Sequence, residues 1–399
     1  MPVIRWVGPN QSIWIARTVL RAACVAFLAL PIAARCDTAL VSDTPSVVVT
    51  PAPAISFPGG RFYISYADTQ TSAVADCNSP LEWIDGTLYA FNSYERIWRG
   101  QGPDLAHLSR GNAVYIDPRL ADLRLWMEGT HRDAKGVLYG WVHNEYPNVC
   151  PDRVRTMPSG HPLLARIGAL RSTDNGKSWN SLGWLMDGRP NELKCDTEGT
   201  YYVGGVGDFV AFVDRERQYI YFFFASYARE FAEQGLGVAR LAYADRDHPM
   251  GKLAVWNGHI WEPSTDGELR HIRPMLPAAA DIHTKGGKIF WGPSVHWNTY
   301  LNKYVMVVNQ TRDAAWDTDG QYVLFTDTLA DPRAWSKPVK FLDWEELRQS
   351  HPPDVRQGWY VQIAGTGQGE TDKLASQTAR LFLEGRSYWQ IRFRKPGEK

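Results

Sequence analysis

Residues 208–224 read Asp-Phe-Val-Ala-Phe-Val-Asp-Arg-Glu-Arg-Gln-Tyr-Ile-Tyr-Phe-Phe-Phe, and their pattern is the strongest structural signal in the chain. Two runs rich in aromatic and β-branched residues, 208–213 and 219–224, flank a polar turn. Runs of this composition are typical of β-strands, and a short polar turn between two of them indicates a hairpin. We therefore predict a hairpin here, with Asp208 at the start of its first strand.

The same order of an apolar strand, a polar turn and an aromatic strand recurs elsewhere in the chain. Its further turns lie at Asp85-Gly86, Lys135-Gly136, residues 298–303 and Glu384-Gly385. When Tyr221 is superposed on Tyr89, Asp208 falls on Asp76 without a gap. The chain thus contains related hairpins in which Asp76 and Asp208 occupy the same register.

The spacing of these hairpins predicts the architecture. Intervals of roughly 50 to 85 residues leave room for two further strands in each repeat, and four-stranded repeats are typical of propeller blades. The sequence therefore predicts an all-β, five-bladed β-propeller over residues 59–399, with one short helix near 344–349. The alternative is a β-sandwich with coincidental hairpins, but their recurrence across the whole domain favours the propeller.

Residues 172–179, Ser-Thr-Asp-Asn-Gly-Lys-Ser-Trp, match the Asp-box pattern S-x-D-x-G-x-x-W. In this pattern Asp and Gly build a tight hairpin turn, and the Trp packs between blade strands. The pattern resembles the boxes at the outer turns of sialidases and other propellers, so it indicates architecture. A turn at the outer rim would hold Asp174 away from the channel axis, and we do not expect Asp174 to be catalytic.

The N-terminal segment has the pattern of an export signal. Arg17 and Arg21 precede an apolar run at 22–34, which is too short for a comfortable membrane span of about 20 residues. We interpret residues 1–36 as a signal peptide and the Pro-rich residues 37–58 as a linker. The mature chain would then be secreted or periplasmic, without a membrane span. The alternative is a chain anchored in the membrane through its N-terminal segment.

Composition and cysteines narrow the class of protein. Lys plus Arg and Asp plus Glu both total 43, so the sequence lacks the basic excess expected of a nucleic-acid binder. Aromatic residues make up 13% of the chain, which suits sheet cores or surfaces that stack on sugars. Cys150 and Cys195 are candidates to bridge loops in an oxidising compartment.

The starts of the first strands hold the candidate catalytic residues. In a propeller these strands line the central channel. Asp76 and Asp208 share this position in the first and third blades, and Glu128 lies two residues further along in the second. Side chains two apart on a strand point to the same face, so the three carboxyl groups could meet in one pocket. Alternatively, each carboxyl group accepts hydrogen bonds from the backbone of a local turn.

From about residue 60 to 395 the chain resembles the five-bladed propeller glycoside hydrolases, the arabinanase, xylosidase and invertase-like group. The resemblance rests on the Ala75-Asp76 opening of the first strand, on the phased hairpins, and on Trp-Gly-Pro-Ser at 291–294. The sequence departs from the group at Cys77-Asn78, where proline is more frequent, and it lacks a clear acidic residue in blade four.

The resemblance implies that three acidic residues from separate blades act on the substrate. Asp76 matches the base or nucleophile of blade one, and Asp208 and Glu128 are the candidates for the general acid and the carboxylate that orients or tunes the base. Glycoside cleavage needs one protonated carboxyl for the leaving oxygen and one ionised carboxylate. Crowded like charges in a partly buried channel separate two such pKa values.

Further residues are candidates for substrate binding. Trp141, His143 and Glu145 alternate along a strand of blade two and would point to one face, while Trp291 and His296 open blade four. The tryptophans would stack on sugar rings, and His143 with Glu145 would bind a sugar hydroxyl. A His–Glu pair without a third ligand is a weak metal signal, so we expect no metal or cofactor and find no indication of structural calcium.

The sequence thus predicts an exported glycoside hydrolase that uses a carboxylate acid/base mechanism on a carbohydrate. The alternative is a non-catalytic propeller that binds glycans or a protein partner, which would keep the aromatic residues without needing perturbed carboxylates. A sialidase-like enzyme is a minor alternative. Such an enzyme needs an arginine cluster, and the expected N-terminal Arg motif is missing, although arginines are available at 99, 240, 273 and 312.

Overall fold

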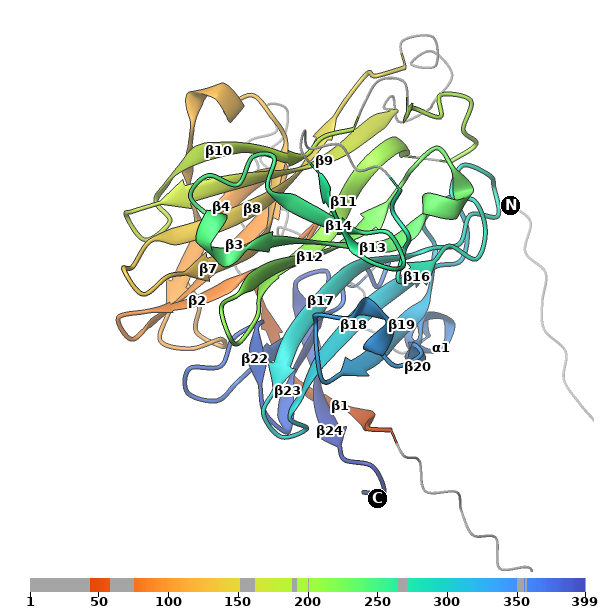
Figure 1. The fold of residues 1–399 in the computed structure, drawn as a ribbon. Coiled ribbons are helices and arrows are strands. Elements are labelled where there is room, and N and C mark those ends of the chain that lie inside the picture. Colours follow the sequence, from red (N-terminus) through yellow and green to blue (C-terminus); the bar gives the residue numbers. More distant parts are fainter. Residues whose placement is uncertain are drawn as a thin grey trace, which may run out of the picture. The chain divides into compact units, whose positions relative to one another are not determined.

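The computed structural model describes most of the chain, namely residues 44–57, 75–150, 162–188, 192–199, 201–264, 271–349, 355 and 357–398. The predicted signal peptide, residues 1–36, lies outside these ranges. Most regular elements of the described residues are β-strands (Figure 1). They pair into four sheets, and the largest of these contains two antiparallel groups that are joined by the parallel pair β9–β11. The strands therefore form five antiparallel groups of at least four strands, and each group is one blade.

The first two blades follow one another in strand order. Blade one consists of β2 (Leu81–Ile84), β3 (Thr87–Tyr94), β4 (Arg96–Gly102) and β5 (Asn112–Ala113). Blade two consists of β7 (Leu125–Arg132), β8 (Leu138–Tyr146), β9 (Leu163–Ser172) and β10 (Ser178–Met186). The short strand β6 (Tyr115–Ile116) pairs in parallel with β10 and ties the end of blade one to the edge of blade two.

Blades three and four repeat this arrangement with longer first strands. Blade three consists of β11 (Tyr202–Val213), β12 (Tyr219–Ser226), β13 (Gly235–Ala242) and β14 (Leu253–Trp256), extended by β15 (Trp261–Ser264) and β16 (Leu276–Pro277). Blade four consists of β17 (Phe290–Asn298), β18 (Lys303–Thr311), β19 (Thr318–Thr326) and β20 (Val339–Asp343). The helix α1 (Trp344–Arg348) follows where the sequence predicted it, and Asp343 caps its N-terminus.

The fifth blade joins the two ends of the chain. It consists of β21 (Gln362–Gly365), β23 (Thr378–Leu383), β24 (Arg386–Arg394) and β1 (Ser46–Ser56), and the short β22 (Leu374–Ala375) pairs with β17. Figure 1 shows β1, in red, beside the blue β24, with which it pairs along most of its length. This placement corrects the interpretation of residues 37–58 as a linker. Extended chain rich in valine and threonine can serve as an edge strand, where proline is tolerated.

Hydrophobic clusters between neighbouring blades show that the ring is closed. Separate clusters of buried side chains lie between blades one and two, two and three, three and four, and four and five. Another cluster packs Ala364 and Phe382 of blade five against Leu81 and Leu88 of blade one. Each blade therefore buries both of its faces against a neighbour, and the predicted five-bladed propeller is confirmed.

The S-x-D-x-G-x-x-W sequence forms the turn between β9 and β10. The Asp174 carboxylate accepts hydrogen bonds from the backbone N–H of Lys177 (3.1 Å) and of Ser178 (2.9 Å). The Trp179 ring is buried, donates its indole N–H to the Gly176 carbonyl (3.1 Å) and meets the Phe91 ring edge-on. The turn therefore holds blade two against blade one, which is a structural task.

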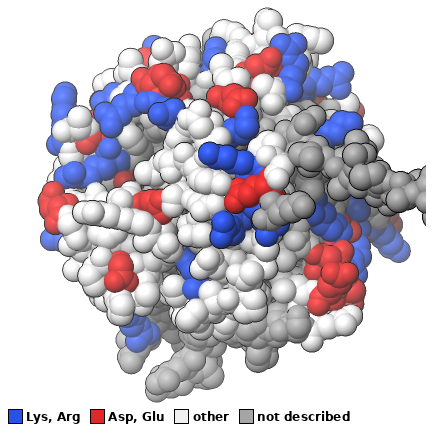
Figure 2. All heavy atoms as spheres, turned by 90° about the horizontal axis from the view of Figure 1, so that it is seen from below, with Lys and Arg blue, Asp and Glu red and all other residues white. Residues whose placement is uncertain are grey.

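Charged side chains of both signs are mixed on the molecular face drawn in Figure 2, so the described residues of this face form no extended surface of one sign. In the described part of the chain, no helix combines the length and the hydrophobicity that crossing a membrane requires.

We expect Gly176→Ala to destabilise the fold more than Gly86→Ala. Both glycines have positive φ (75° and 80°), which costs an alanine about 1 kcal/mol. A Cβ at Gly176 would also lie 2.5 Å from the Phe91 ring, whereas a Cβ at Gly86 meets nothing within 4 Å. Urea denaturation should therefore show a loss of about 1 kcal/mol for Gly86→Ala and about 2–4 kcal/mol for Gly176→Ala. Equal losses would contradict the packing role of the turn.

Candidate active site

One cavity of about 400 Å³ opens where the first strands of the blades begin. All five blades contribute to its wall, because Asp76 precedes β2, Trp126 lies on β7, Asp208 on β11, Trp291 on β17 and Tyr360 just before β21. The remaining lining residues are Tyr94, Glu95, Arg124, Glu145, Leu163, Tyr201, Tyr202, Trp316, Gln357, Trp359 and Glu384. Asp76 and Asp208 thus face one cavity, as their shared register led us to expect. Their catalytic roles stay predictions.

The backbone around this cavity is strained. Non-glycine residues with positive φ are uncommon, and each such conformation costs of order 1–3 kcal/mol. Such residues of the cavity wall are Glu95, Asp208, Trp316, Tyr360 and Glu384, with φ between 41° and 68°. Strain of this kind persists where the surrounding structure holds a side chain in a required position, and it gathers at functional sites. Glu95 and Glu384 belong to hairpin turns, where positive φ is common, so it is the strain at Asp208, Trp316 and Tyr360 that supports this cavity as the candidate active site.

Three phenol groups surround the carboxylate of Asp208. Tyr360 donates its hydroxyl to Oδ1 at 2.9 Å and Tyr227 donates its hydroxyl to Oδ2, while the Tyr202 hydroxyl oxygen lies 3.3 Å from Oδ2. The rings of Tyr202 and Tyr227 stack at 4.0 Å, which fixes both hydroxyls. Both oxygens of Asp208 therefore have donors from blades three and five, and the carboxylate is held in one orientation.

Asp76 has the opposite kind of environment. Asp76 is half-buried, and this burial raises the pKa of its carboxyl group well above the usual value, an effect that the charges of Glu145 and Asp208 increase. The neighbouring Trp126 indole and His143 lower the pKa by less. Among the described residues Asp76 has no ion pair, so the neutral, protonated form is favoured.

Glu145 lies on β8 and faces the same cavity. Burial raises its pKa, but His143, the Tyr202 hydroxyl and Arg124 each favour the ionised form. Tyr202 donates its hydroxyl to Oε1 at 2.8 Å, so this phenol ring connects Glu145 with Asp208. The two carboxyl groups Asp76 and Glu145 thus share a cavity but differ in what stabilises their charge.

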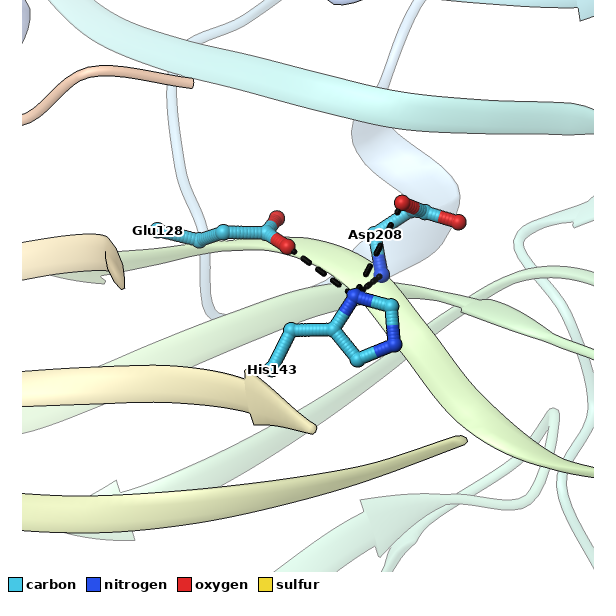
Figure 3. Close-up of side chains that lie close together, drawn as sticks. All are labelled: Glu128, His143 and Asp208. Atoms are coloured by element: carbon cyan, nitrogen blue, oxygen red, sulfur yellow. Dashed lines mark hydrogen bonds and ion pairs between the residues drawn. The ribbon is translucent and has the colours of Figure 1, made fainter. Parts of the chain in front are cut away.

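Glu128 lies beneath this cavity and is absent from its wall. Its Oε1 is 3.2 Å from Nδ1 of His143 (Figure 3). Its Oε2 accepts the backbone N–H of Phe209 at 2.6 Å. Burial raises the pKa of Glu128 to about 7, against the opposing effect of His143. This position differs from the expected one because β7 has an irregular register between Met127 and Gly129, where Glu128 lies. Glu128 can therefore affect a substrate only through other groups.

His143 completes the buried pair. Burial opposes its positive charge, but the hydrogen bond with Glu128 and the charges of Asp208 and Glu128 outweigh burial and raise its pKa to about 9. Its Nδ1 lies 3.8 Å from Oδ1 of Asp208, and its ring faces Gly207, where a Cβ would lie 2.4 Å from Nε2. An imidazolium here places a positive charge among the carboxyl groups of the site.

Within the described residues, Glu128, His143 and Asp208 are the group whose nitrogen and oxygen atoms are close enough to consider for a metal ion, all within 4.8 Å. Hydrogen bonds already occupy the carboxylate oxygens, since both oxygens of Asp208 accept phenol hydroxyls and both oxygens of Glu128 have donors. Nε2 of His143 is buried without a hydrogen-bond partner among the described residues.

Three residues expected to bind substrate, Trp141, His143 and His296, do not line the cavity. Trp141 is buried between blades two and three, edge-on to Phe222. His296 is buried against Phe393 of blade five, and burial lowers its pKa to about 3. Trp141 follows the alternation predicted for its strand, but Trp141 and His296 both lie too far from the strand ends that open to the cavity. Residues deeper along the same face enter the core between blades.

Sequence reasoning missed most of the aromatic wall. Tyr202 and Tyr227 flank the predicted strands of blade three, whereas Trp316, Trp359 and Tyr360 lie in loops. The hairpin β23–β24 contains the predicted turn Glu384-Gly385, but β21 precedes this hairpin and pairs with the other edge of β23, so β21 is the first strand of blade five. A strand pattern at 362–365 is the signal that could have directed attention to the residues just before it, as with Asp76.

The charge of the wall is strongly negative. Asp76, Glu145 and Asp208 lie inside it, and Glu95 and Glu384 lie at its edge. Arg124 is the basic side chain among the described lining residues, and it pairs with Glu95 at 3.3 Å. The four arginines considered for a sialidase-like site lie elsewhere. The described wall of the cavity therefore has no unpaired basic side chain to bind a carboxylate of a substrate.

A disulfide links two segments that lead into the cavity. Cys150 follows β8, which carries Glu145, and Cys195 precedes β11, which carries Tyr202 and Asp208. The Cα atoms of the two cysteines are 5.7 Å apart. This bridge agrees with the pairing considered from the sequence and holds the ends of blades two and three together beside the cavity.

Comparison with known proteins gives similarity of fold alone. No protein-family model matches the sequence, and no curated protein matches it. A thermostable family-43 glycoside hydrolase shares 10% identity at a TM-score of 0.46, over 85% of this chain and 91% of that one. The arabinanase of Bacillus subtilis shares 10% at 0.43, over 80% and 96%. The exo-β-1,3-galactanase of Phanerochaete chrysosporium shares 13% at 0.43, over 85% of this chain but only 63% of that enzyme.

The buried pair predicts how stability depends on pH. The pKa of His143 is raised to about 9 in the folded protein, against about 6.5 in an unfolded chain. Its stabilising effect is therefore complete below about pH 6.5 and is lost as the pH rises through 9. The raised pKa of Glu128 adds to this effect at the lower end of the range. The free energy of unfolding of the wild type, minus that of the double variant Glu128→Gln/His143→Gln, should therefore fall steadily as the pH rises from about 6.5 to about 9.

Chemical denaturation across this pH range measures the difference. His296→Gln is the matched control, because the pKa of His296 is lowered to about 3 and this residue stays neutral in the fold throughout the range. It should leave the alkaline decline unchanged. A double variant that declines as steeply as the wild type would show that the pair does not hold the extra proton.

Removal of the disulfide by Cys150→Ser/Cys195→Ser should lower the free energy of unfolding by about 2–4 kcal/mol, because the bridge closes a long loop. Loosening of the segment before β11 should also disturb Tyr201 and Tyr202 and so weaken ligand binding. Dithiothreitol should lower the melting temperature of the wild type and leave that of the variant unchanged. If dithiothreitol lowers both equally, another effect of reduction is responsible.

Proposed function

We propose that this protein hydrolyses glycosidic bonds of an uncharged glycan, with Asp76 and Glu145 as the acid/base pair. The observation that carries this proposal is the presence of two half-buried carboxyl groups, both with raised pKa, in one aromatic-lined cavity. Glycoside cleavage requires a protonated and an ionised carboxyl on either side of the bond, and different surroundings are what separates their pKa values.

Asp76 is assigned the proton. Its carboxyl is half-buried without an ion-pair partner among the described residues, and the neighbouring carboxylates further disfavour its ionisation. It would therefore protonate the leaving oxygen. This assignment differs from the role of base or nucleophile that the family resemblance implies for Asp76, and the experiment below separates the two.

Glu145 is assigned the negative charge. The Tyr202 hydroxyl and the His143 imidazolium favour its ionised form. It would act on water or on the anomeric carbon. Asp208 is proposed as a fixed charge that raises the pKa of Asp76 and stabilises positive charge that develops on the sugar ring, since its oxygens are already bound by tyrosines. Glu128 acts on the site through His143.

The aromatic wall supports a sugar as the ligand. The Trp291 ring meets the rings of Trp316 and Trp359 edge to face, at centroid distances of 4.8 Å and 5.7 Å. Tyr201 adds a further ring, which is edge-on to Trp316. Such surfaces stack on the apolar faces of sugar rings. The buried indole N–H of Trp291 lacks a hydrogen-bond acceptor within the described structure, so it is available to a sugar hydroxyl.

The negative wall favours an uncharged substrate over an acidic sugar. A sialidase-like activity would need several arginines around a substrate carboxylate, whereas Arg124 is already paired with Glu95. Export is part of the proposal, with the Cys150–Cys195 disulfide as its support, because such bridges persist in oxidising compartments.

Hydrolysis of aryl glycosides with good and poor leaving groups tests the roles. Asp76→Asn should lower kcat/KM about 10²- to 10⁴-fold for a poor leaving group and much less for a good one, since only the former needs a proton. Glu145→Gln should lower kcat/KM for both. Glu216→Gln, a change of an exposed carboxylate on the β11–β12 turn, is the matched control and should retain activity.

The reverse dependence on the leaving group would exchange the two roles and agree with the family resemblance. Absence of hydrolysis on aryl glycosides and polysaccharides, together with glycan binding that survives Asp76→Asn, would show a carbohydrate-binding propeller instead of an enzyme.

A further inference from the structure

A second cavity of about 350 Å³ lies between blades two and three. Gly188 after β10 forms one part of its wall, Gly205 and Val206 on β11 form another, and Ser226 at the end of β12 lies at its side. Tyr227, the residue after Ser226, reaches Asp208 in the first cavity. The two cavities are therefore neighbours that share β11 and β12 but have different linings.

The lining of this second cavity is acidic. Its carboxylates are Asp187, Glu192, Glu230 and Glu233, of which Asp187 and Glu233 are half-buried. Burial raises the pKa of Glu233, and the charges of Glu192 and Glu230 add to this effect, although His271 and Arg273 offset part of it. The carboxylates thus lie close enough to repel one another, and a bound cation would relieve that repulsion.

Protein cations neutralise only part of this charge. Asp187 pairs with Arg166 at 3.7 Å, and Glu230 pairs with Arg229 at 4.0 Å. The second pair is exposed on both sides, and exposed pairs of this kind contribute little. Arg166 is also stacked at 3.8 Å on the ring of Trp184, which keeps its guanidinium at the outer wall. Glu192 and Glu233 make no ion pair within the described residues.

Ser226 supplies an independent sign of a ligand. Its side chain is fully buried, lines the cavity, and its hydroxyl has no hydrogen-bond partner among the described residues. A buried hydroxyl without a partner costs about 1–3 kcal/mol, so such groups are normally satisfied. A polar ligand atom in the cavity would provide the missing hydrogen bond.

The spacing of the acidic groups indicates the kind of cation. In the described residues these carboxylates do not form a group of three with oxygens within 4.8 Å of one another, unlike Glu128, His143 and Asp208. They are therefore not arranged as a preformed chelate, which a divalent ion needs. A volume of about 350 Å³ is in the range of cavities that bind small organic molecules.

We propose that the cavity between blades two and three binds a primary ammonium group. Glu233, Glu192 and the Ser226 hydroxyl accept hydrogen bonds from this group. The group belongs to an amino sugar of a glycan or to a free polyamine, since both present the same –NH₃⁺ with three donors. Ser226 Oγ accepts one hydrogen bond at the buried end, and the carboxylates accept the others. The proposal stands apart from catalysis, because it uses none of the residues assigned to the first cavity.

Calorimetric titration of the full chain with glucosamine, N-acetylglucosamine and spermidine tests the site. We expect glucosamine or spermidine to bind at least tenfold more tightly than N-acetylglucosamine, which has lost the positive charge. Glucosamine binding alone would identify an amino sugar as the source, and spermidine binding alone a polyamine. If neither amine binds more tightly than N-acetylglucosamine, the proposal is wrong.

Variants locate the binding and separate it from catalysis. Glu233→Gln should weaken amine binding about three- to tenfold, the loss of one charge-assisted hydrogen bond at a half-buried position. Asp76→Asn and Glu145→Gln should leave it unchanged, whether or not the protein proves to be a hydrolase. Binding lost in Glu145→Gln but retained in Glu233→Gln would place the amine in the first cavity and overturn the proposal.

Ser226→Ala tests the proposal in a second way, through both the affinity for the amine and the stability of the ligand-free protein. It should weaken amine binding about threefold and leave the melting temperature of the ligand-free protein unchanged or raised, because it removes an unsatisfied buried hydroxyl. A purely structural hydroxyl would give the opposite pattern, with a lower melting temperature and unchanged affinity.

Discussion

Asp76, Glu128, Glu145 and Asp208 place four carboxyl groups in the interior of one domain, where desolvation and mutual repulsion oppose their ionisation. Each group meets this cost in a different way: Asp208 accepts phenol hydroxyls, Glu128 pairs with His143, Glu145 shares Tyr202 with Asp208, and Asp76 favours its proton. The four carboxyl groups therefore differ in chemistry because each has different neighbours that offset the repulsion. Asp208 and Tyr360, which are hydrogen-bonded to each other, both have a strained backbone with positive φ.

This arrangement requires a closed ring of blades. Tyr360 precedes the first strand of blade five and reaches Asp208 of blade three, so the two blades must be held at a fixed separation. Strand β1 completes blade five on β24, and the cluster around Phe382 packs that blade against blade one. Residues 46–56 thus contribute to the geometry of a site that they do not touch.

The local sequence pattern predicted the blades well because the residue types of a strand depend on its pairing and burial within the same hairpin. Aromatic and β-branched runs with tight turns identified most hairpins, and the register of Asp76 and Asp208 placed both in one cavity. Prediction failed where partners came from distant segments. The linker at 37–58 contains an edge strand whose partner lies over 300 residues away, and Trp141 and His296 lie on the expected face but beneath the neighbouring blade.

The amino-acid sequence alone determined the all-β class, the repeat, the turn at 172–179 and the supply of carboxyl and aromatic side chains, because each depends on neighbours within a hairpin. Only the tertiary structure decided how burial and neighbouring charges shift the pKa of Asp76, Glu128 and Glu145, that Glu128 lies outside the cavity wall, and that tyrosines before β21 and after β12 bind Asp208. These properties depend on burial and on charges brought together from separate blades, and no local pattern in a chain encodes those distances.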